Sequence, residues 1–435
     1  MRPMAPAILA VMLGVATAAP AVEGTARFDS LFHDRSLRLD YFHTGTRTEE
    51  SISLDAYRLE PGGWAGSREN LLDTLAWGKY RLTIKDTGTG EVLFTRSYAT
   101  LFGEWQTTDE AGNGTPRTFH ESVQMPLPKK PATVTLASRR KDNSFADVIT
   151  FPLDPASRSI LRALPPADAT ATDVEINGPA EHSVDLLFVG DGYTASEAEK
   201  FRRDVRRFVE RLFRFSPFKE NRKRFNVRAV EAWTPLSGVS EPRKGVWRDT
   251  PAGSAFNTFD IERYLTTTEN RKLRDLASAA PYDRLLVMVN SSRYGGGGIH
   301  DCFAVFTSDN EYSGYVMVHE FGHAFAGLGD EYYTSEVAYN EFYPAGIEPY
   351  EPNISALIPG GRPKWAAQMT PGVPVPTPAD PNRYASAVGA FEGAGYAAKG
   401  LYRPALDCQM FSKGDAPFDP VCSHAIQQVI DALAE

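Results

Sequence analysis

The sequence predicts a two-domain protein in which an all-β sandwich precedes an α/β domain. Its 435 residues exceed the usual size of one domain, and 42% of them are hydrophobic, so the chain can bury a sizeable core. Short alternating stretches fill the first third, whereas near-continuous apolar strands and amphipathic helices alternate afterwards. These patterns place the sandwich at residues 22–155, a linker at 156–175 and the α/β domain at 176–435.

The chain begins with the features of a secretory signal peptide. Arg2 precedes an apolar run from Ile8 to Ala19, and small residues suited to cleavage follow. We therefore expect residues 1–21 to be removed and the mature protein to be secreted or periplasmic. No later segment is apolar enough to predict a membrane span. The net charge of −9 argues against nucleic acid as a partner.

In the first domain, the clearest element is a β-hairpin. Residues 79–85 and 91–96 alternate apolar and polar side chains on either side of a turn rich in Gly and Thr. The same alternation predicts strands at residues 37–42, 51–59, 132–138 and 148–153. No titratable cluster stands out in this domain, so we expect the chemistry to lie in the second one.

The second domain begins with a nearly continuous apolar strand, which predicts that this strand is buried on both faces. This strand, at residues 184–190, is followed by a capping box from Thr194 to Glu197 and then by an amphipathic helix. Further elements are expected as strands at 225–233 and 284–290 and as helices at 261–279 and 421–433. Alternating strands and helices of this kind predict an α/β architecture.

The segment His319-Glu-Phe-Gly-His323 is the strongest functional signal in the sequence. Histidines four residues apart lie one turn apart on the same helix face, so both imidazoles can reach one zinc ion at ~2.0–2.1 Å. Zinc lowers the pKa of a bound water towards ~7, and Glu320 is placed to accept its proton during attack on a carbonyl. The motif therefore predicts a zinc-dependent endopeptidase that acts on protein or peptide substrates.

A catalytic zinc site needs a third protein ligand besides the two histidines. After the motif, Gly327 and Gly329 can end the helix and turn the chain back on itself. That turn directs Asp330 or Glu331 towards the metal. We favour Asp330 as the third ligand, with Glu331 and the more distant Glu392 as the alternatives.

Beyond the motif, three stretches carry a wider resemblance. They are HEFGHxxxGLxDEYY from His319, the segment Phe391–Tyr396 with Tyr402–Pro404, and Cys408–Met410 with Pro420–Cys422. In these stretches the chain resembles the IgA-peptidase family of metallopeptidases, over roughly residues 180–435 and with a β-domain before them. The resemblance implies a metzincin-like zincin catalytic domain, with Met410 in the Met-turn that forms a hydrophobic floor under the metal.

The same resemblance suggests how substrate binds. It implies that Ile299–Phe306 is the edge strand bordering the cleft, to which an extended peptide adds by main-chain hydrogen bonds. The glycine run Gly295–Gly298 is then expected to be a mobile rim. Tyr332 or Tyr333 would donate a hydrogen bond to the developing oxyanion.

Two further points stay open at this stage. Cys408 and Cys422 could pair in an oxidising compartment and leave Cys302 as a free thiol. The competing interpretation of the chain is a non-catalytic metal-containing binding protein built on a metallopeptidase fold. Glu320 argues against that interpretation, because a purely structural metal site has no need of its carboxylate.

Overall fold

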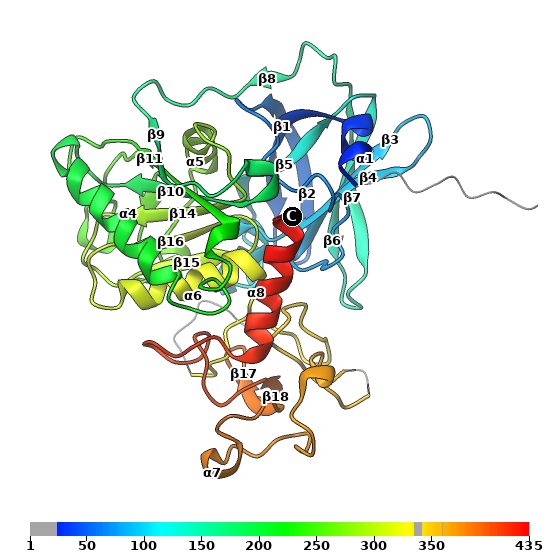
Figure 1. Ribbon diagram of the computed structural model, residues 1–435, viewed down its shortest axis with the longest axis vertical. Coiled ribbons are helices and arrows are strands. Elements are labelled where there is room, and N and C mark those ends of the chain that lie inside the picture. The colour runs from blue at the N-terminus through cyan, green and yellow to red at the C-terminus, as the bar shows by residue number, and fades with distance from the viewer. Residues whose placement is uncertain (1–23, 335–341, 359, 435) are drawn as a thin grey trace, which may run out of the picture.

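The computed structural model describes residues 24–334, 342–358 and 360–434 (Figure 1). The first third of the chain, in blue and cyan, forms a β-rich domain beside an α/β domain in green and yellow. An orange segment extends below them, and the red C-terminal helix runs back up against the rest of the molecule. The expected signal peptide, residues 1–21, lies outside the described residues.

The β-rich domain consists of two four-stranded sheets, with strand orders β5-β1-β2-β8 and β4-β3-β6-β7. The strands are β1 (Phe32–Gly45), β2 (Glu50–Leu59), β3 (Tyr80–Asp86), β4 (Val92–Tyr98), β5 (Arg117–Pro128), β6 (Ala132–Arg139), β7 (Phe145–Leu153) and β8 (Leu161–Arg162). Short helices are α1 (Gly24–Leu31), α2 (Leu101–Trp105) and α3 (Asp109–Gly112). The antiparallel pairing of β3 with β4 confirms the predicted hairpin.

Apolar and polar side chains alternate along these strands, and the apolar ones form one core that the two sheets share. Leu82 and Ile84 of β3 are fully buried and cluster with Leu39 of β1 and Met125 of β5. The side chain of Asp86 accepts hydrogen bonds from two backbone N–H groups of the β3–β4 turn, which fixes the hairpin geometry. A continuous core of this kind joins the two sheets into one domain.

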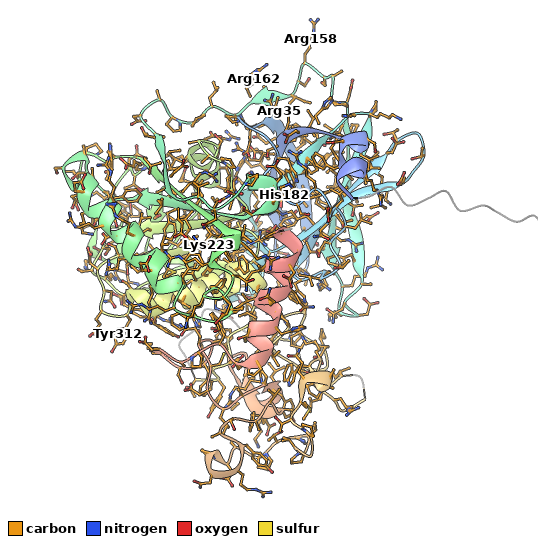
Figure 2. All side chains as sticks on the ribbon, viewed as in Figure 1. Arg35, Arg158, Arg162, His182, Lys223 and Tyr312 are labelled. Atoms are coloured by element: carbon orange, nitrogen blue, oxygen red, sulfur yellow. The ribbon has the colours of Figure 1, made fainter. Side chains whose placement is uncertain are left out.

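Residues 156–175, predicted as a linker, contain two strands instead of only irregular chain. β8 pairs in parallel with β2 of the first domain, and β9 (Thr170–Glu175) pairs antiparallel with β11 (Phe225–Glu231) of the second. The connection runs over the surface, where Arg158 and Arg162 project outward (Figure 2). Both strands lie at sheet edges, so their exposed side chains show no hydrophobic pattern in the sequence.

The α/β domain is built on a six-stranded sheet of order β15-β16-β14-β10-β11-β9. Its other strands are β10 (Val184–Asp191), β14 (Arg284–Val289), β15 (Gly296–Ile299) and β16 (Phe303–Thr307), and its helices are α4 (Ala198–Leu212), α5 (Asn270–Ala277), α6 (Ser313–Ala326) and α8 (Pro420–Leu433). The four central strands are parallel, and the strands at both edges are antiparallel to their neighbours. The predicted α/β class and the capping box at Thr194 are confirmed.

Both faces of this sheet are covered, as the apolar strands predict. Leu186 and Phe188 of β10 point into a core formed with α4, α6 and α8. Leu187 and Val189 point to the opposite face, where they meet α5 and the side chain of Trp105 from the first domain. The first domain therefore takes the place of a covering layer on one side of the six-stranded sheet.

The helix predicted at residues 261–279 is wrong in its first half. Only α5, from Asn270, is an α-helix there, while Thr266–Thr267 form strand β13, which pairs with β12 (Ser254–Ala255). Consecutive β-branched threonines favour extended backbone, and the apolar spacing of this segment does not reveal that preference.

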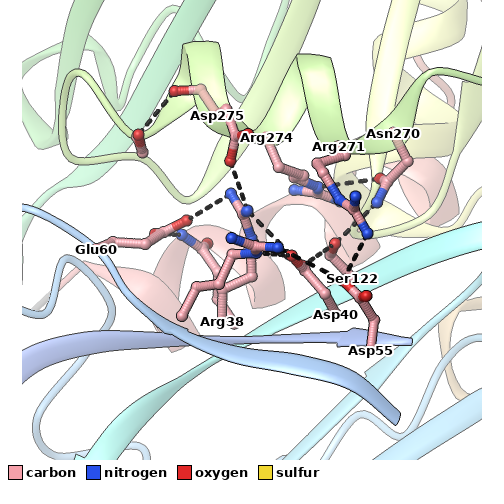
Figure 3. Close-up of polar contacts among 12 residues, drawn as sticks. Arg38, Asp40, Asp55, Glu60, Ser122, Asn270, Arg271, Arg274 and Asp275 are labelled. Atoms are coloured by element: carbon pink, nitrogen blue, oxygen red, sulfur yellow. Dashed lines mark hydrogen bonds and ion pairs between the residues drawn. The ribbon is translucent and has the colours of Figure 1, made fainter. Parts of the chain in front are cut away.

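A buried polar interface joins the first domain to α5 (Figure 3). The guanidinium of Arg38 on β1 is fully buried and contacts Asp40 at 2.8 Å and Asp275 of α5 at 2.7 Å. Beside it, the amide of Asn270 donates to the hydroxyl of Ser122 on β5 at 2.8 Å. Removing one partner of a buried ion pair typically costs about 3–5 kcal/mol, because it leaves a buried charge without compensation, so burial of Arg38 at this interface requires its acidic partners.

The carboxyl groups of Asp185 and Asp283 lie close together at the central sheet, and they predict how the stability of the fold depends on pH. The N–H of Asp185 on β10 donates to the carboxyl of Asp283 at 2.9 Å. Burial, reinforced by the negative charge of Asp185, raises the pKa of Asp283. A carboxyl whose pKa is raised in the folded state contributes stability at low pH, and this stability is lost as pH rises from about 4 through the raised pKa.

We therefore expect Asp283→Asn to flatten the pH dependence of stability. The neutral amide can still accept the N–H of Asp185 but has no charge to bury. Between about pH 5 and about pH 9, the melting temperature of the wild type should fall several degrees more than that of the variant, since 1 kcal/mol corresponds to roughly 2–4 °C. The exposed Asp147→Asn serves as the control, and parallel curves for wild type and Asp283→Asn would contradict the prediction.

Between α6 and α8 the chain forms a largely irregular extension. Its regular elements are α7 (Pro381–Tyr384), β17 (Phe391–Ala394) and β18 (Ala397–Arg403). α8 then returns to the core of the α/β domain, where Ile426 and Ile430 are fully buried. Within the described ranges, no helix combines the length and the apolar character needed to cross a membrane.

Candidate active site

The two histidines of the HExxH segment lie on one face of α6. Gly327 caps this helix in the left-handed conformation, with φ of 58°, and its N–H donates to the carbonyl of His323 at 3.0 Å. Glycine adopts this conformation without strain, so the prediction that Gly327 ends the helix is confirmed. Because the helix is unbroken up to that cap, the Nε2 atoms of His319 and His323 lie 3.2 Å apart.

The turn after the helix brings the carboxylate of Asp330 to the same point. Its Oδ1 lies 3.0 Å from Nε2 of His319 and 3.3 Å from Nε2 of His323. Ligands of a tetrahedral zinc ion with bonds of ~2.0–2.1 Å lie roughly 3.3–3.4 Å apart, close to these distances. Oδ1 is also buried and makes no hydrogen bond to any described residue. The three atoms therefore fit the ligand set of a small divalent cation.

The remaining polar atoms of these three residues are held by outer partners. Nδ1 of His319 faces the carbonyl of Gln409 at 3.1 Å, and Nδ1 of His323 faces the carbonyl of Leu328 at 2.5 Å. A ring nitrogen that faces a carbonyl carries a proton, which leaves Nε2 of each imidazole to face Asp330 and the position of a metal ion. The hydroxyl of Tyr396 donates to Oδ2 of Asp330.

The charge of Asp330 is set by the same neighbours. Burial alone would raise the pKa of its carboxyl, but the imidazoles of His323 and His319 hold it well below its usual range. Asp330 is therefore ionised, as a metal ligand must be.

The other two carboxylates considered as third ligands lie elsewhere. Glu331 is fully buried, but its Oε1 accepts hydrogen bonds from Asn353 at 2.9 Å and from the thiol of Cys422 at 3.1 Å. Glu392 is exposed, and its Oε1 accepts the N–H of Gly400 at 3.1 Å. Of the three alternatives, the structure brings only Asp330 to the two histidines.

Met410 lies beneath the helix that carries the histidines. It is fully buried, and its Sδ would be 2.9 Å from a Cβ placed on Gly322, which lies between the two histidines on α6. Its carbonyl accepts the N–H of Glu331 at 2.9 Å. Gly322 leaves the room for the sulfur, so Met410 packs directly against the helix that carries the histidines. That Met410 forms a floor under the metal stays a prediction.

The glycine run forms an ordered strand, which corrects the expected mobile rim. Gly296–Ile299 is β15, the antiparallel edge strand of the sheet, and β16 follows only after a turn at residues 300–302. The single edge strand expected at residues 299–306 is therefore also wrong. The carbonyl of Gly296 already accepts the N–H of Leu265, although at a long 3.4 Å.

Glycine is required in β15 because the strand packs directly on α6. A Cβ at Gly298 would lie 2.3 Å from the carbonyl oxygen of Glu320 and 2.9 Å from Cβ of His323. A Cβ at Gly296 would lie 2.5 Å from Val316. Small residues at these positions let the edge strand reach the catalytic helix with backbone contact.

We expect Gly298→Ala to lower both stability and peptidase activity. Overpacking of this kind typically costs about 1–3 kcal/mol, and here the clash is with the backbone that positions both Glu320 and His323. Thermal unfolding and a peptide-cleavage assay measure the two effects. Gly314→Ala is the matched control, because its Cβ would meet only the flexible side chain of Arg211 at 3.3 Å. Unchanged melting and activity in Gly298→Ala would refute the close approach.

Glu320 faces the cleft beside the two histidines. Burial raises the pKa of its carboxyl, while the imidazoles of His319 and His323 act in the opposite direction. A carboxylate with a raised pKa is a better proton acceptor at neutral pH than one in bulk water.

The cleft in front of this cluster has a volume of about 560 Å³ and lies between the two domains. One wall consists of β15, α6 and the turn to Asp330. The first domain also contributes to the lining, with basic residues that include Arg47, Lys79 and Arg140, and so does the segment 342–351 of the extension after α6. Sequence reasoning assigned no part of the site to the first domain, because the patterns of separate segments do not show which of them meet in space.

Of the two tyrosines considered as oxyanion donors, only Tyr332 lines the cleft. Its ring lies nearly parallel to that of His319, with centroids 6.2 Å apart. Burial raises the pKa of its hydroxyl well above the usual range, so the group keeps its proton. Tyr333 instead packs against Phe411 and beneath the guanidinium of Arg403.

The hairpin turn after β15 is anchored to both domains. Asp301 in this turn contacts Arg96 of β4 and Arg284 of β14, the latter at 2.5 Å. Despite burial, these two guanidinium groups lower the pKa of Asp301 to about 2. The N–H of Asp301 donates to the carbonyl of Ala324 on α6 at 2.9 Å, so the first domain, the edge strand and the catalytic helix meet at one residue.

Comparison with known proteins agrees with this architecture. The pattern of the IgA peptidase M64 family matches residues 173–385 and 379–430, and the pattern of the peptidase M64 N-terminus matches residues 27–150. No curated protein matches the chain. The two patterns together cover most of the sequence and include the HExxH helix, the Asp330 turn and Met410. The resemblance expected from the sequence is thereby confirmed, and the chain belongs to the IgA peptidase M64 family and is a peptidase.

Proposed function

We propose that this peptidase is a zinc-dependent endopeptidase in which His319, His323 and Asp330 bind the metal and Glu320 is the general base and acid. The observation that carries the proposal is the convergence of two imidazole nitrogens and one unpartnered carboxylate oxygen at 3.0–3.3 Å from one another. The set of two histidines and one carboxylate with an open side is typical of catalytic zinc rather than structural zinc.

Each group in the cleft then has a role in peptide hydrolysis. Zinc, when bound, would act as a Lewis acid on the scissile carbonyl and make a water molecule more acidic. Glu320 accepts the proton of the attacking water and passes it to the departing amine. The protonated hydroxyl of Tyr332 donates to the oxygen on which negative charge develops. The outer partners Gln409 and Tyr396 keep His319 and Asp330 in their binding orientation.

The domain arrangement supports cleavage within a chain. The cleft lies between two domains and is lined from both, and we propose that an extended peptide lies across it with residues on both sides of the scissile bond. We propose a metzincin-like catalytic domain and a sandwich arrangement of the first domain, whose two sheets share a core. The signal-peptide features of residues 1–21 lead us to propose that the enzyme is secreted or periplasmic.

The proposal is tested on the purified protein with a peptide library and with casein. We expect internal cleavage that stops when the metal is removed with a chelator and returns when zinc is added. Mass spectrometry of the products separates endopeptidase from exopeptidase action, because an exopeptidase releases only terminal residues. A protein that binds zinc but cleaves neither substrate at any metal loading would instead favour a non-catalytic binding function.

A further inference from the structure

A second group of metal-ligating side chains lies next to the catalytic cluster and faces away from the cleft. Glu331, Cys408, Asp419 and Cys422 are buried, and one ligand atom from each lies within 4.8 Å of the others. All three cysteines of the chain are thiols, so the disulfide between Cys408 and Cys422 that the sequence left open is not formed.

Each carboxylate of this group has one oxygen held in place and one oxygen unpartnered. Oε1 of Glu331 accepts the amide N–H of Asn353 at 2.9 Å, and Oδ1 of Asp419 accepts the N–H groups of Val421 and Cys422 at 2.7 and 3.0 Å. Oε2 of Glu331 and Oδ2 of Asp419 are buried and have no hydrogen-bond partner among the described residues. Oδ1 of Asp330 in the catalytic cluster has the same property.

The sulfur atoms are oriented by the backbone. Sγ of Cys408 accepts N–H contacts from Met410 at 3.5 Å and from Asp419 at 3.4 Å. The thiol of Cys422 points to Glu331 at 3.1 Å. With no cation bound, burial raises the pKa of both thiols well above the usual range, so they keep their protons. Once a metal displaces those protons, N–H groups that face a sulfur stabilise the thiolate that binds it.

Two unpartnered carboxylate oxygens in a protein interior need a positive charge. The N-terminus of the 14-residue helix α8, capped by Asp419, supplies partial positive charge. The buried guanidinium of Arg403 also acts on Glu331. Neither donates a hydrogen bond to the two free oxygens. With no cation bound, burial and the neighbouring charge of Asp419 raise the pKa of Glu331 well above its usual range, so the two carboxyl groups share a proton that a cation would replace.

We propose that Glu331, Cys408, Asp419 and Cys422 bind a second divalent cation of the zinc class in a closed, structural site. Two thiolates and two carboxylates are a ligand set that zinc accepts in tetrahedral geometry, and thiolates select against magnesium and calcium. Ligands of such a site lie roughly 3.3–3.8 Å apart, so small side-chain rotations close it. On binding, the cation takes lone pairs from both sulfurs and both carboxylates, and the two thiol protons and the proton shared by Glu331 and Asp419 leave to solvent.

The position of this site gives the ion a structural role. It joins the turn that carries Asp330, the segment whose Gln409 carbonyl holds His319, and the start of α8. An ion there would fix the floor beneath the catalytic cluster without touching substrate. A closed site of this kind contributes to folding stability rather than to the reaction.

Cobalt substitution tests the second site separately from the catalytic one. The proposed catalytic ligands include no sulfur, so thiolate-to-cobalt charge-transfer absorption reports only on Cys408 and Cys422. The double variant His319→Ala/His323→Ala removes the catalytic ligands and keeps all four residues of the second site. We expect this variant to bind one equivalent of Co²⁺ with charge-transfer absorption, and the wild type to bind two equivalents.

Matched cysteine variants complete the test. In the double-variant background, Cys422→Ser should abolish the charge-transfer absorption, whereas Cys302→Ser should leave it unchanged, because Cys302 lies outside the group. Thiol titration of the denatured, metal-free wild type should find three thiols per chain. Absence of charge-transfer absorption in the cobalt-loaded wild type, or one thiol in place of three, would overturn the second site. A wild type that binds no metal at the catalytic ligands but still shows charge-transfer absorption would contradict the proposed catalytic site and would support the second site.

Discussion

Replacing Glu320 with glutamine is expected to lower kcat for peptide cleavage by about 10²–10⁴-fold, the usual contribution of a general acid–base group. Glutamine has nearly the same shape but cannot accept a proton. Its side chain lines the cleft beside the two histidines without holding either of them, since their Nδ1 atoms contact backbone carbonyls. Metal content and melting temperature should therefore match the wild type while turnover is lost.

A second glutamate near the same helix provides the control for this experiment. Glu311 is exposed and lies just before α6, outside the cleft. Glu311→Gln removes the same charge from the same region, and we expect its kcat to equal that of the wild type. Equal cleavage rates for Glu320→Gln and wild type would show that another group moves the proton.

Replacing Asp330 with alanine is expected to weaken metal binding by at least about 100-fold. Loss of an outer partner of a metal ligand typically costs about 10–100-fold in affinity, and loss of the ligand itself should cost more. Removal of the carboxylate also leaves two neighbouring imidazoles without the negative charge that now faces both at 3.0–3.3 Å. Competition against a chromogenic chelator measures the affinity, and peptidase activity should fall in parallel.

Two further variants show how large the loss of metal affinity in Asp330→Ala is compared with smaller changes near the site. Tyr396→Phe removes the hydroxyl that donates to Asp330, so its effect should fall in the range of about 10–100-fold. Glu392→Ala, at the exposed carboxylate that the sequence left as an alternative ligand, should bind metal like the wild type. Strong loss in Glu392→Ala with little loss in Asp330→Ala would reverse the assignment of the third ligand.

Local sequence rules predicted the parts of this protein that depend on neighbouring residues. The motif spacing placed His319 and His323 on one helix face, and Gly327 marked the end of that helix. The turn after the helix offered Asp330 or Glu331 as the third ligand, with the distant Glu392 as a further alternative, and the structure brings Asp330 to the histidines. The hairpin of β3 and β4 followed from alternation and turn chemistry in the same way.

Features that depend on distant partners could not be predicted. The run Gly295–Gly298 reads as flexible in the sequence, yet its glycines are required because α6 lies against β15. Residues 170–175 are polar and read as linker, but they complete the edge of the catalytic sheet. The second cluster joins Glu331 to cysteines about 80–90 residues away, and no local spacing reveals such a group.

The buried guanidinium of Arg38, between β1 and α5, belongs to the contact between the two domains that border the cleft. Because the two domains also share a buried core at their contact, we do not expect the cleft between them to widen enough for a bulky folded protein, and a target should enter it as a single extended strand. We expect native globular proteins to be cut only in linkers and tails, and the same proteins to be cut throughout once denatured, which limited proteolysis of one target in both states would show. The selectivity of this enzyme would then depend as much on whether the target backbone is unfolded as on the side chains of the target.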